Sequence, residues 1–127
     1  MSTKAIPAAD KMVFRKTNQH IGRKIAVTPS NSTNRHLSYG RIILNSEQPS
    51  IKFRNGAEET GLVCLSGAAT IIAGGQQFDL SRYDSVYVPR GSEIELKTNS
   101  QVDFAEFSEA VKQLGLYWLA LNEPPPL

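Results

Sequence analysis

Residues 59–91 read ETGLVCLSGAATIIAGGQQFDLSRYDSVYVPRG, and this stretch carries the strongest indication of fold class. It consists of short apolar runs separated by glycine-containing turns, and Gly74-Gly75 between two such runs is a hairpin signal. Leu62–Leu65 is apolar at every position, which is typical of a strand buried on both faces. The stretch therefore predicts several short strands, with turns at Ser66-Gly67 and Pro89–Gly91.

Strand patterns continue on both sides of this stretch. Ile51 and Phe53 alternate with charged residues, and so do Ile94 and Leu96, which is the period of half-buried strands. Further strands are expected at Met12–Phe14, Lys24–Thr28, Leu37–Leu44 and Val102–Phe107. Because these patterns recur at roughly 8–12-residue spacing and no central segment has a helical period, the sequence predicts an all-β sandwich or barrel.

A chain of 127 residues that is 40% hydrophobic and 20% charged fits one soluble domain, which we divide into three parts. Residues 1–36 form a basic extension whose strands pair with the barrel or with a partner subunit. Residues 37–110 form the barrel. Residues 111–127 form an apolar arm, expected as a short helix with Ser108 as its cap, and a proline-rich end. The apolar run LYWLAL in this arm predicts packing on the barrel or on a second subunit, and hence a homodimer.

Charge and cysteine content exclude several function classes. No apolar run approaches the roughly 20 residues that a membrane helix needs. Residues 1–46 hold eight Lys or Arg and one acid, but few aromatic residues lie among them, so we do not expect nucleic acid as a partner. The favoured alternative is that this basic segment docks on the acidic remainder of its own fold or of a neighbouring subunit. The single cysteine, Cys64, lies in an apolar run and is expected to be a buried thiol in a cytoplasmic protein.

Residues 40–110 resemble the N-terminal half of the bacterial uronate isomerases of the cupin class, which are 5-deoxy-glucuronate isomerase and 5-keto-4-deoxyuronate isomerase. The motifs that carry the resemblance are Glu59-Thr-Gly61, Leu65-Ser-Gly67, the hairpin around Gly74-Gly75, Tyr83–Gly91 and Val102–Ser108. The resemblance implies a single cupin, which is a double-stranded β-helix or jelly-roll-like barrel. Extra strands would precede this barrel, and a short C-terminal apolar helix or arm would follow it.

The resemblance implies a scaffold without a complete active site, since those enzymes bind their metal in a second, C-terminal cupin. In the general cupin pattern the metal ligands are a His-x-His pair, a Glu and a third His. The corresponding positions hold Thr60, Ile94, and either Arg54 with Gly56 or Phe53 with Asn55. The two histidines, His20 and His36, lie in the N-terminal third without ligand partners nearby. Because a metal site needs at least three convergent donors, we expect no metal and no cofactor.

Polar residues near the two cupin motifs are the candidate ligand-binding site. They are Arg54, Glu58, Glu59, Tyr87, Arg90 and Glu93. Two carboxylates and an arginine could move a proton on a sugar acid, with Arg90 or Arg54 holding the substrate carboxylate. The alternative is that Glu58 and Glu59 are solvated turn residues and that Arg90 forms a surface ion pair.

These observations favour a metal-free cupin related to the uronate isomerases, acting as a scaffold, dimerisation or carbohydrate-binding module. It could be part of a sugar isomerase, in which case the reaction would be an aldose–ketose isomerisation of a sugar acid. Two alternatives remain open. One is a small cupin pyrimidine or purine nucleoside phosphorylase, in which basic residues hold phosphate. The other is a regulatory domain that binds a sugar acid or another small anion without chemistry.

Overall fold

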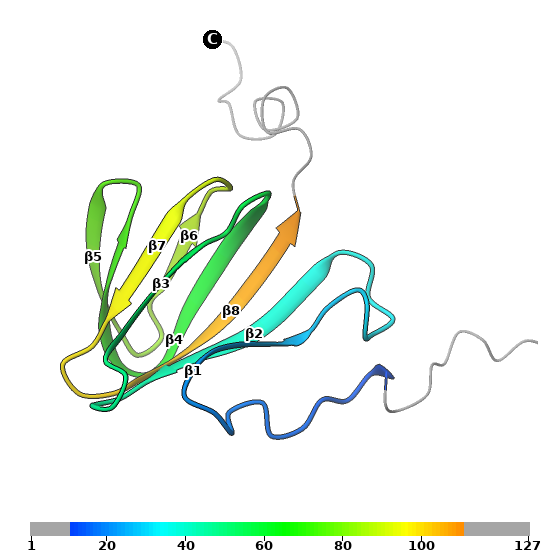
Figure 1. Ribbon diagram of the computed structural model, residues 1–127, viewed down its shortest axis with the longest axis horizontal. Helices are drawn as coiled ribbons and strands as arrows, with labels where there is room; N and C mark the ends of the chain where they lie inside the picture. The colour runs from blue at the N-terminus through cyan, green and yellow to red at the C-terminus, as the bar shows by residue number, and fades with distance from the viewer. Residues whose placement is uncertain (1–10, 111–127) are drawn as a thin grey trace, which may run out of the picture.

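The computed structural model describes residues 11–110. The expected apolar arm at 111–127 and the first ten residues lie outside this part. The expected role of Ser108 as a helix cap is wrong, because Ser108 is a buried residue of a strand that runs over Val102–Ala110. The elements of the described part are β1 (Gly22–Val27), β2 (Leu37–Leu44), β3 (Ser50–Arg54), β4 (Glu58–Ala73), β5 (Gln76–Ser81), β6 (Ser85–Val88), β7 (Glu93–Lys97) and β8 (Val102–Ala110). The predicted all-β fold class is confirmed (Figure 1).

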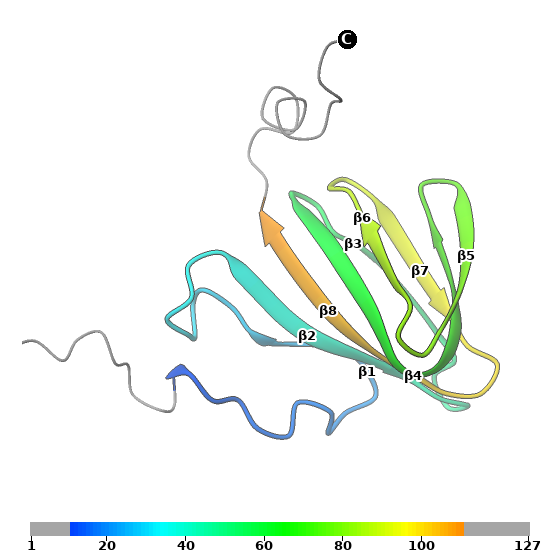
Figure 2. The ribbon, with the colours of Figure 1, turned by 180° about the vertical axis from the view of Figure 1, so that it is seen from behind.

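The strands form one antiparallel sheet that curls into a half-barrel (Figures 1 and 2). The strand order is β1-β2-β8-β4-β7-β3, and β5 and β6 each pair with β4. The first half of β4 pairs with β8 and β6, and its second half pairs with β5 and β7. β4 therefore belongs to both walls of the half-barrel, which we call wall A (β1, β2, β8, β6 and the start of β4) and wall B (β3, β7, β5 and the end of β4).

The predicted turn at Ser66-Gly67 is wrong, because these residues lie inside β4, at an irregularity in its pairing with β8. The runs Leu62–Leu65 and Ala69–Ile72 are thus two halves of one strand. Gly67 has φ of 80°, and a Cβ there would lie 2.1 Å from the carbonyl oxygen of Gln101. Glycine is required because the start of β8 passes directly against this bend.

A second correction concerns Met12–Phe14, which was expected to form a strand and has no strand structure. Its apolar side chains are not buried deeply, and Met12 and Val13 are exposed. The first strand begins at Gly22 and its register partners lie in β2. The expected strand at Leu37–Leu44 matches β2.

The core lies between the two walls and is built by the inward-facing alternate residues of each strand. Eight apolar side chains in it have no exposed surface: Ile42, Leu44, Leu62, Cys64, Ile71, Ile94, Leu96 and Phe104. The expected burial of Cys64 is confirmed, and its Sγ lies 3.5 Å from the carbonyl oxygen of Gly67. Burial raises the pKa of the Cys64 thiol.

Candidate functional site

The six candidate residues lie at one end of the half-barrel, which we call the rim. Arg54 ends β3, Glu58 and Glu59 begin β4, Tyr87 is in β6, Arg90 follows β6, and Glu93 begins β7. Antiparallel pairing brings these strand ends together, because Arg54 is opposite Glu93 and Thr60 is opposite Val88. Within the rim, Arg54 pairs with Glu93, whereas Tyr87 pairs with Glu59.

Arg54 and Glu93 form a surface ion pair on wall B. Their neighbours Phe53 and Ile94 point into the core, so the two charged side chains point outward. The distance between Arg54 Nη1 and Glu93 Oε2 is 4.0 Å, and both side chains are more than half exposed. A pair of this kind stabilises the fold by only about 0–1 kcal/mol, so both groups can also meet a ligand in solvent.

Glu59 and Tyr87 form a second pair on the outer face of wall A. The Tyr87 hydroxyl donates a hydrogen bond of 3.0 Å to Glu59 Oε2. Burial, and then this bond to a carboxylate, raise the pKa of Tyr87 to about 12. Glu59 and Glu93 are thus bound to different partners on different walls. Glu58 and Arg90 are partly buried.

Asn55 joins the two cupin-motif loops at the rim, a role that the turn prediction did not include. Its side-chain amide donates to the carbonyl oxygen of Pro89 at 2.8 Å, and its Oδ1 accepts from the backbone N–H of Ser92 at 2.9 Å. A weaker contact of 3.3 Å runs to the hydroxyl of Thr60. Since Asn55 is 6% exposed, these bonds fix the loop geometry from inside the protein.

A buried ion pair between β1 and β8 was also missed by the sequence analysis. Glu106 is 1% exposed, and its two carboxylate oxygens accept from Arg23 Nε and Nη2, each at 2.8 Å. The guanidinium also lies 3.9 Å from the ring centroid of Phe53 in β3. Arg23 therefore connects wall A to wall B. The sequence pattern that could have revealed this pair is the alternation of Val102, Phe104 and Glu106, which places Glu106 on the same inward face as the two apolar residues. A carboxylate buried there requires a cation beside it.

The described residues do not fit a metal ion. Thr60 and Ile94, which take the place of ligands in the cupin pattern, are both buried, and Ile94 has no donor atom. Within residues 11–110, no group of three His, Cys, Asp or Glu side chains converges. His20 Nε2 lies 3.1 Å from the carbonyl oxygen of Arg41, and His36 is exposed. In the same range, every buried side-chain nitrogen and oxygen has a protein partner.

The outer face of wall A carries a row of aromatic side chains. The register aligns Tyr39, Phe107, Gly61 and Tyr87 on four neighbouring strands. The Tyr39 and Phe107 rings are in contact, with centroids 5.1 Å apart. Phe107 is 38% exposed and Tyr87 is 47% exposed. Gly61 lies between them, and a Cβ at this position would meet no atom within 4 Å, so the row contains a notch.

A search of the described residues finds no helix long and apolar enough to cross a membrane. No protein-family model matches the sequence, and no curated protein matches it either.

Solved structures do resemble this one. The EutQ protein of Clostridium difficile is 15% identical, with a TM-score of 0.58 over 83% of this chain and 79% of that one. A cupin protein from Bacteroides fragilis is 13% identical, with a TM-score of 0.60 over 85% of this chain and 92% of the other. The cupin domain of Schizosaccharomyces pombe Cnp3 is 11% identical, with a TM-score of 0.58 over 82% and 72%. At these identities the likeness concerns the fold, and together with the curled eight-stranded sheet it shows that this chain has the cupin fold.

Proposed function

We propose that the protein is a cupin module that acts by association through its surface, as a homodimerising scaffold, rather than through a metal centre inside its barrel. The interior supports this proposal because apolar side chains fill the core and the buried polar groups of residues 11–110 are bonded to one another. A catalytic or metal-binding interior would instead present polar atoms that await a ligand.

The observation that carries the proposal is the aromatic row on wall A. Read across the strands, it runs Tyr39, Phe107, Gly61, Tyr87. A second copy, related by a two-fold axis parallel to the strands, presents the same row in reverse. Phe107 of each copy then faces the Gly61 notch of the other, and Tyr39 faces Tyr87. This self-complementarity is what an isologous dimer interface requires.

The test is sedimentation equilibrium over a concentration series. Wild-type protein is expected to dimerise. Gly61→Val fills the notch, and its Cβ would meet no atom of the subunit within 4 Å, so it should give a folded monomer. Phe107→Ser should do the same. Tyr83→Ser is the matched control, because Tyr83 is 73% exposed but lies in the turn between β5 and β6. A monomeric wild type, or a dimer that Gly61→Val leaves intact, would contradict the proposal.

Salt dependence adds a second check on the same arrangement. Glu59 and Glu109 are register partners and lie one row closer to the rim than the aromatic row. The two-fold axis therefore brings Glu59 of one copy toward Glu109 of the other. Like charges at an exposed rim repel less at high ionic strength. We therefore expect dimerisation to strengthen when salt is added, whereas a dimer held by ion pairs would weaken.

A second candidate function is binding of a sugar acid at the rim, and it rests on the sequence motifs shared with the uronate isomerases. The placement of Arg54, Arg90, Glu58 and Glu93 at one end of the barrel favours it. Thermal-shift measurements with glucuronate and glucose test it, since only the acid should raise the melting temperature and Arg54→Gln should remove the effect.

Following glucuronate by NMR would reveal aldose–ketose isomerisation. Phosphate-dependent cleavage of a nucleoside would instead favour the phosphorylase alternative, and binding without turnover the regulatory one.

A further inference from the structure

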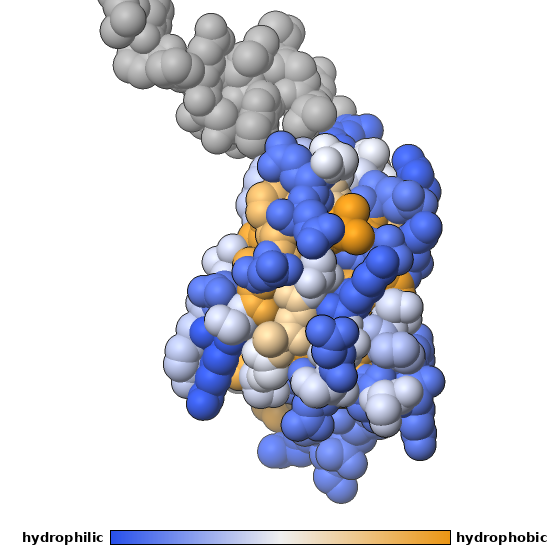
Figure 3. All heavy atoms as spheres, turned by 90° about the vertical axis from the view of Figure 1, so that its left-hand side faces the viewer, coloured by the Kyte–Doolittle hydropathy of each residue, from blue (hydrophilic) through white to orange (hydrophobic). Residues whose placement is uncertain are grey.

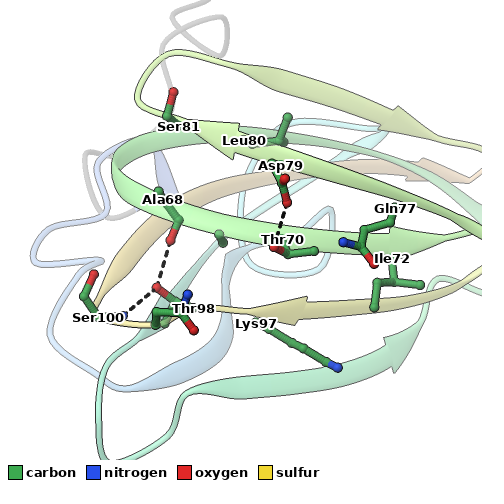
Figure 4. Close-up of a pocket in the computed structure, with 12 residues that line it drawn as sticks. Ala68, Thr70, Ile72, Gln77, Asp79, Leu80, Ser81, Lys97, Thr98 and Ser100 are labelled. Carbon is green, nitrogen blue, oxygen red and sulfur yellow. Dashed lines mark hydrogen bonds between the residues drawn. The ribbon is translucent and has the colours of Figure 1, made fainter.

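The outward face of wall B contains a hollow of about 600 Å³ that is separate from both the rim pairs and the aromatic row. Figure 4 shows the hollow, with β4 in the middle, β5 on one side and β7 on the other. Figure 3 views the molecule from the side of β5, where hydrophilic side chains predominate and apolar ones show between them. The surface is therefore suited to a polar ligand rather than to an apolar partner.

The register arranges the floor of the hollow as two short rows. Lys97, Thr70 and Asp79 lie side by side in the first row, from β7, β4 and β5. Ile72 and Gln77 lie side by side in the second row, and Glu95 of β7 continues that row just outside the lining of the hollow. From the ordinary strand dimensions this grid measures about 10 Å across the strands and about 7 Å along them. An area of this size suits one sugar ring with its hydroxyl groups.

Hydrogen bonds hold these groups before any ligand arrives. The Thr70 hydroxyl donates to Asp79 Oδ1 at 2.8 Å, which orients the carboxylate and leaves Oδ2 to accept from a ligand. At the end of the hollow, the Thr98 hydroxyl donates to the carbonyl oxygen of Ala68 at 2.8 Å and accepts from the backbone N–H of Ser100. Thr98 is 8% exposed, so these bonds hold the turn at the end of the hollow from inside the protein. Such preorganisation lowers the entropy cost of binding.

The chemistry of the grid selects the class of ligand. Asp79 supplies acceptors, Lys97 supplies donors, and the Gln77 amide supplies both. The lining holds one cation, Lys97, and one anion, Asp79, so it has no net charge to attract an anion. Glu95 beside the hollow also competes for Lys97, since Lys97 Nζ lies 3.8 Å from Glu95 Oε2. A neutral polyol can bind these donors and acceptors together. The half-buried Ile72 offers an apolar contact to C–H groups of a ring.

From this geometry we propose that the outward hollow of wall B is a binding site for a neutral sugar. It differs from the second candidate function in both place and charge, because the rim would bind a sugar acid through its arginines. It is also compatible with a dimer through wall A, since the two surfaces lie on opposite walls of the half-barrel.

The experiment is an NMR titration of ¹⁵N-labelled full-length protein with glucose, galactose, mannose, N-acetylglucosamine and cellobiose, and with glucuronate as the anionic comparison. At least one neutral sugar should shift backbone amides of 70–72, 77–79 and 97–100, while glucuronate should leave them unchanged. Removing one hydrogen bond to a charged group weakens binding about tenfold. Asp79→Ala should have this effect, and Gln77→Ala should also weaken binding. Lys24→Ala is the control, because Lys24 is an exposed residue of β1 on wall A, and this variant should bind as the wild type does.

Two outcomes would overturn the proposal. One is that no neutral sugar shifts these amides although the protein is folded. The other is that Asp79→Ala binds as tightly as the wild type. Glucuronate shifts at Arg54, Arg90 and Glu93, with no change at 70–72, 77–79 and 97–100, would support the separation of the two sites by ligand charge that the proposal requires. A change of oligomeric state would affect neither result, so this proposal and the homodimer can fail separately.

Discussion

The strongest energetic prediction concerns the ion pair between Arg23 and Glu106, whose two members differ in exposure. Glu106 is 1% exposed, whereas the Arg23 side chain is 30% exposed. Removal of Arg23 leaves a carboxylate inside the protein without its cation. Removal of Glu106 leaves a guanidinium that can turn toward solvent. The two single substitutions should therefore have unequal costs.

Loss of one partner from a buried ion pair typically costs about 3–5 kcal/mol, and the partial exposure of this pair favours the lower end. We expect Arg23→Met to lower the free energy of unfolding by about 3 kcal/mol, although methionine still contacts the Phe53 ring. Glu106→Leu should cost only about 1 kcal/mol, because leucine fills the space and Arg23 can be rehydrated. The double variant should also lie about 1 kcal/mol below the wild type, which gives a coupling energy near 3 kcal/mol.

The assay is urea unfolding followed by circular dichroism, with all four proteins at one concentration because dimerisation would change the apparent stability. The reasoning is refuted if Arg23→Met stays within about 1 kcal/mol of the wild type, or if Glu106→Leu is as damaging as Arg23→Met. Either result would mean that the carboxylate reaches water or that another group replaces the guanidinium.

Three further predictions follow from local geometry. Gly67→Ala should destabilise the protein by about 2–5 kcal/mol in thermal unfolding, because its φ is positive and the new Cβ would strike the Gln101 backbone. Tyr87 should ionise near pH 12 in an ultraviolet titration, and Glu59→Gln should lower that pKa. Since the folded pKa is above the unfolded value of 10.0, the stabilisation linked to Tyr87 is fully present below pH 10.0 and is lost as pH rises through about 12. Cys64 should react slowly with a disulfide reagent in the native protein and rapidly in urea, and fast native reaction would contradict its burial.

The strand positions were predictable because this fold is built from local periodicity. Apolar alternation located β3 and β7, and the all-apolar run located part of β4. The expected burial of that run on both faces is wrong, because Leu62 and Cys64 are buried but Val63 and Leu65 on the outer face are partly exposed. The turn signal at Ser66-Gly67 was misread, since a glycine needed for a reversal and one needed for close backbone approach look alike in sequence. Only the position of Gln101 opposite Gly67 distinguishes them, and that contact depends on tertiary structure.

The candidate site was harder to predict because its side-chain contacts also depend on tertiary structure. Sequence patterns placed six polar residues at the rim, but their side-chain partners depend on which face of which strand each one occupies. Alternation with Phe104 could have identified Glu106 as inward-facing, yet its cation lies 83 residues earlier in the chain. The hollow on wall B is formed from residues of three strands whose alignment depends on register. No short sequence motif predicts that alignment.

The central place of β8 has a consequence for the order of synthesis. β8 lies between β2 and β4, although it is the last of the described strands to leave the ribosome. Until residues 102–110 emerge, β2 and the first half of β4 each have an open hydrogen-bonding edge and an uncovered apolar face. Open edges of this kind attract other chains. Among the strands of residues 11–110, the most aggregation-prone stage of synthesis therefore comes just before β8 emerges, and a slow codon between 73 and 102 would prolong that interval.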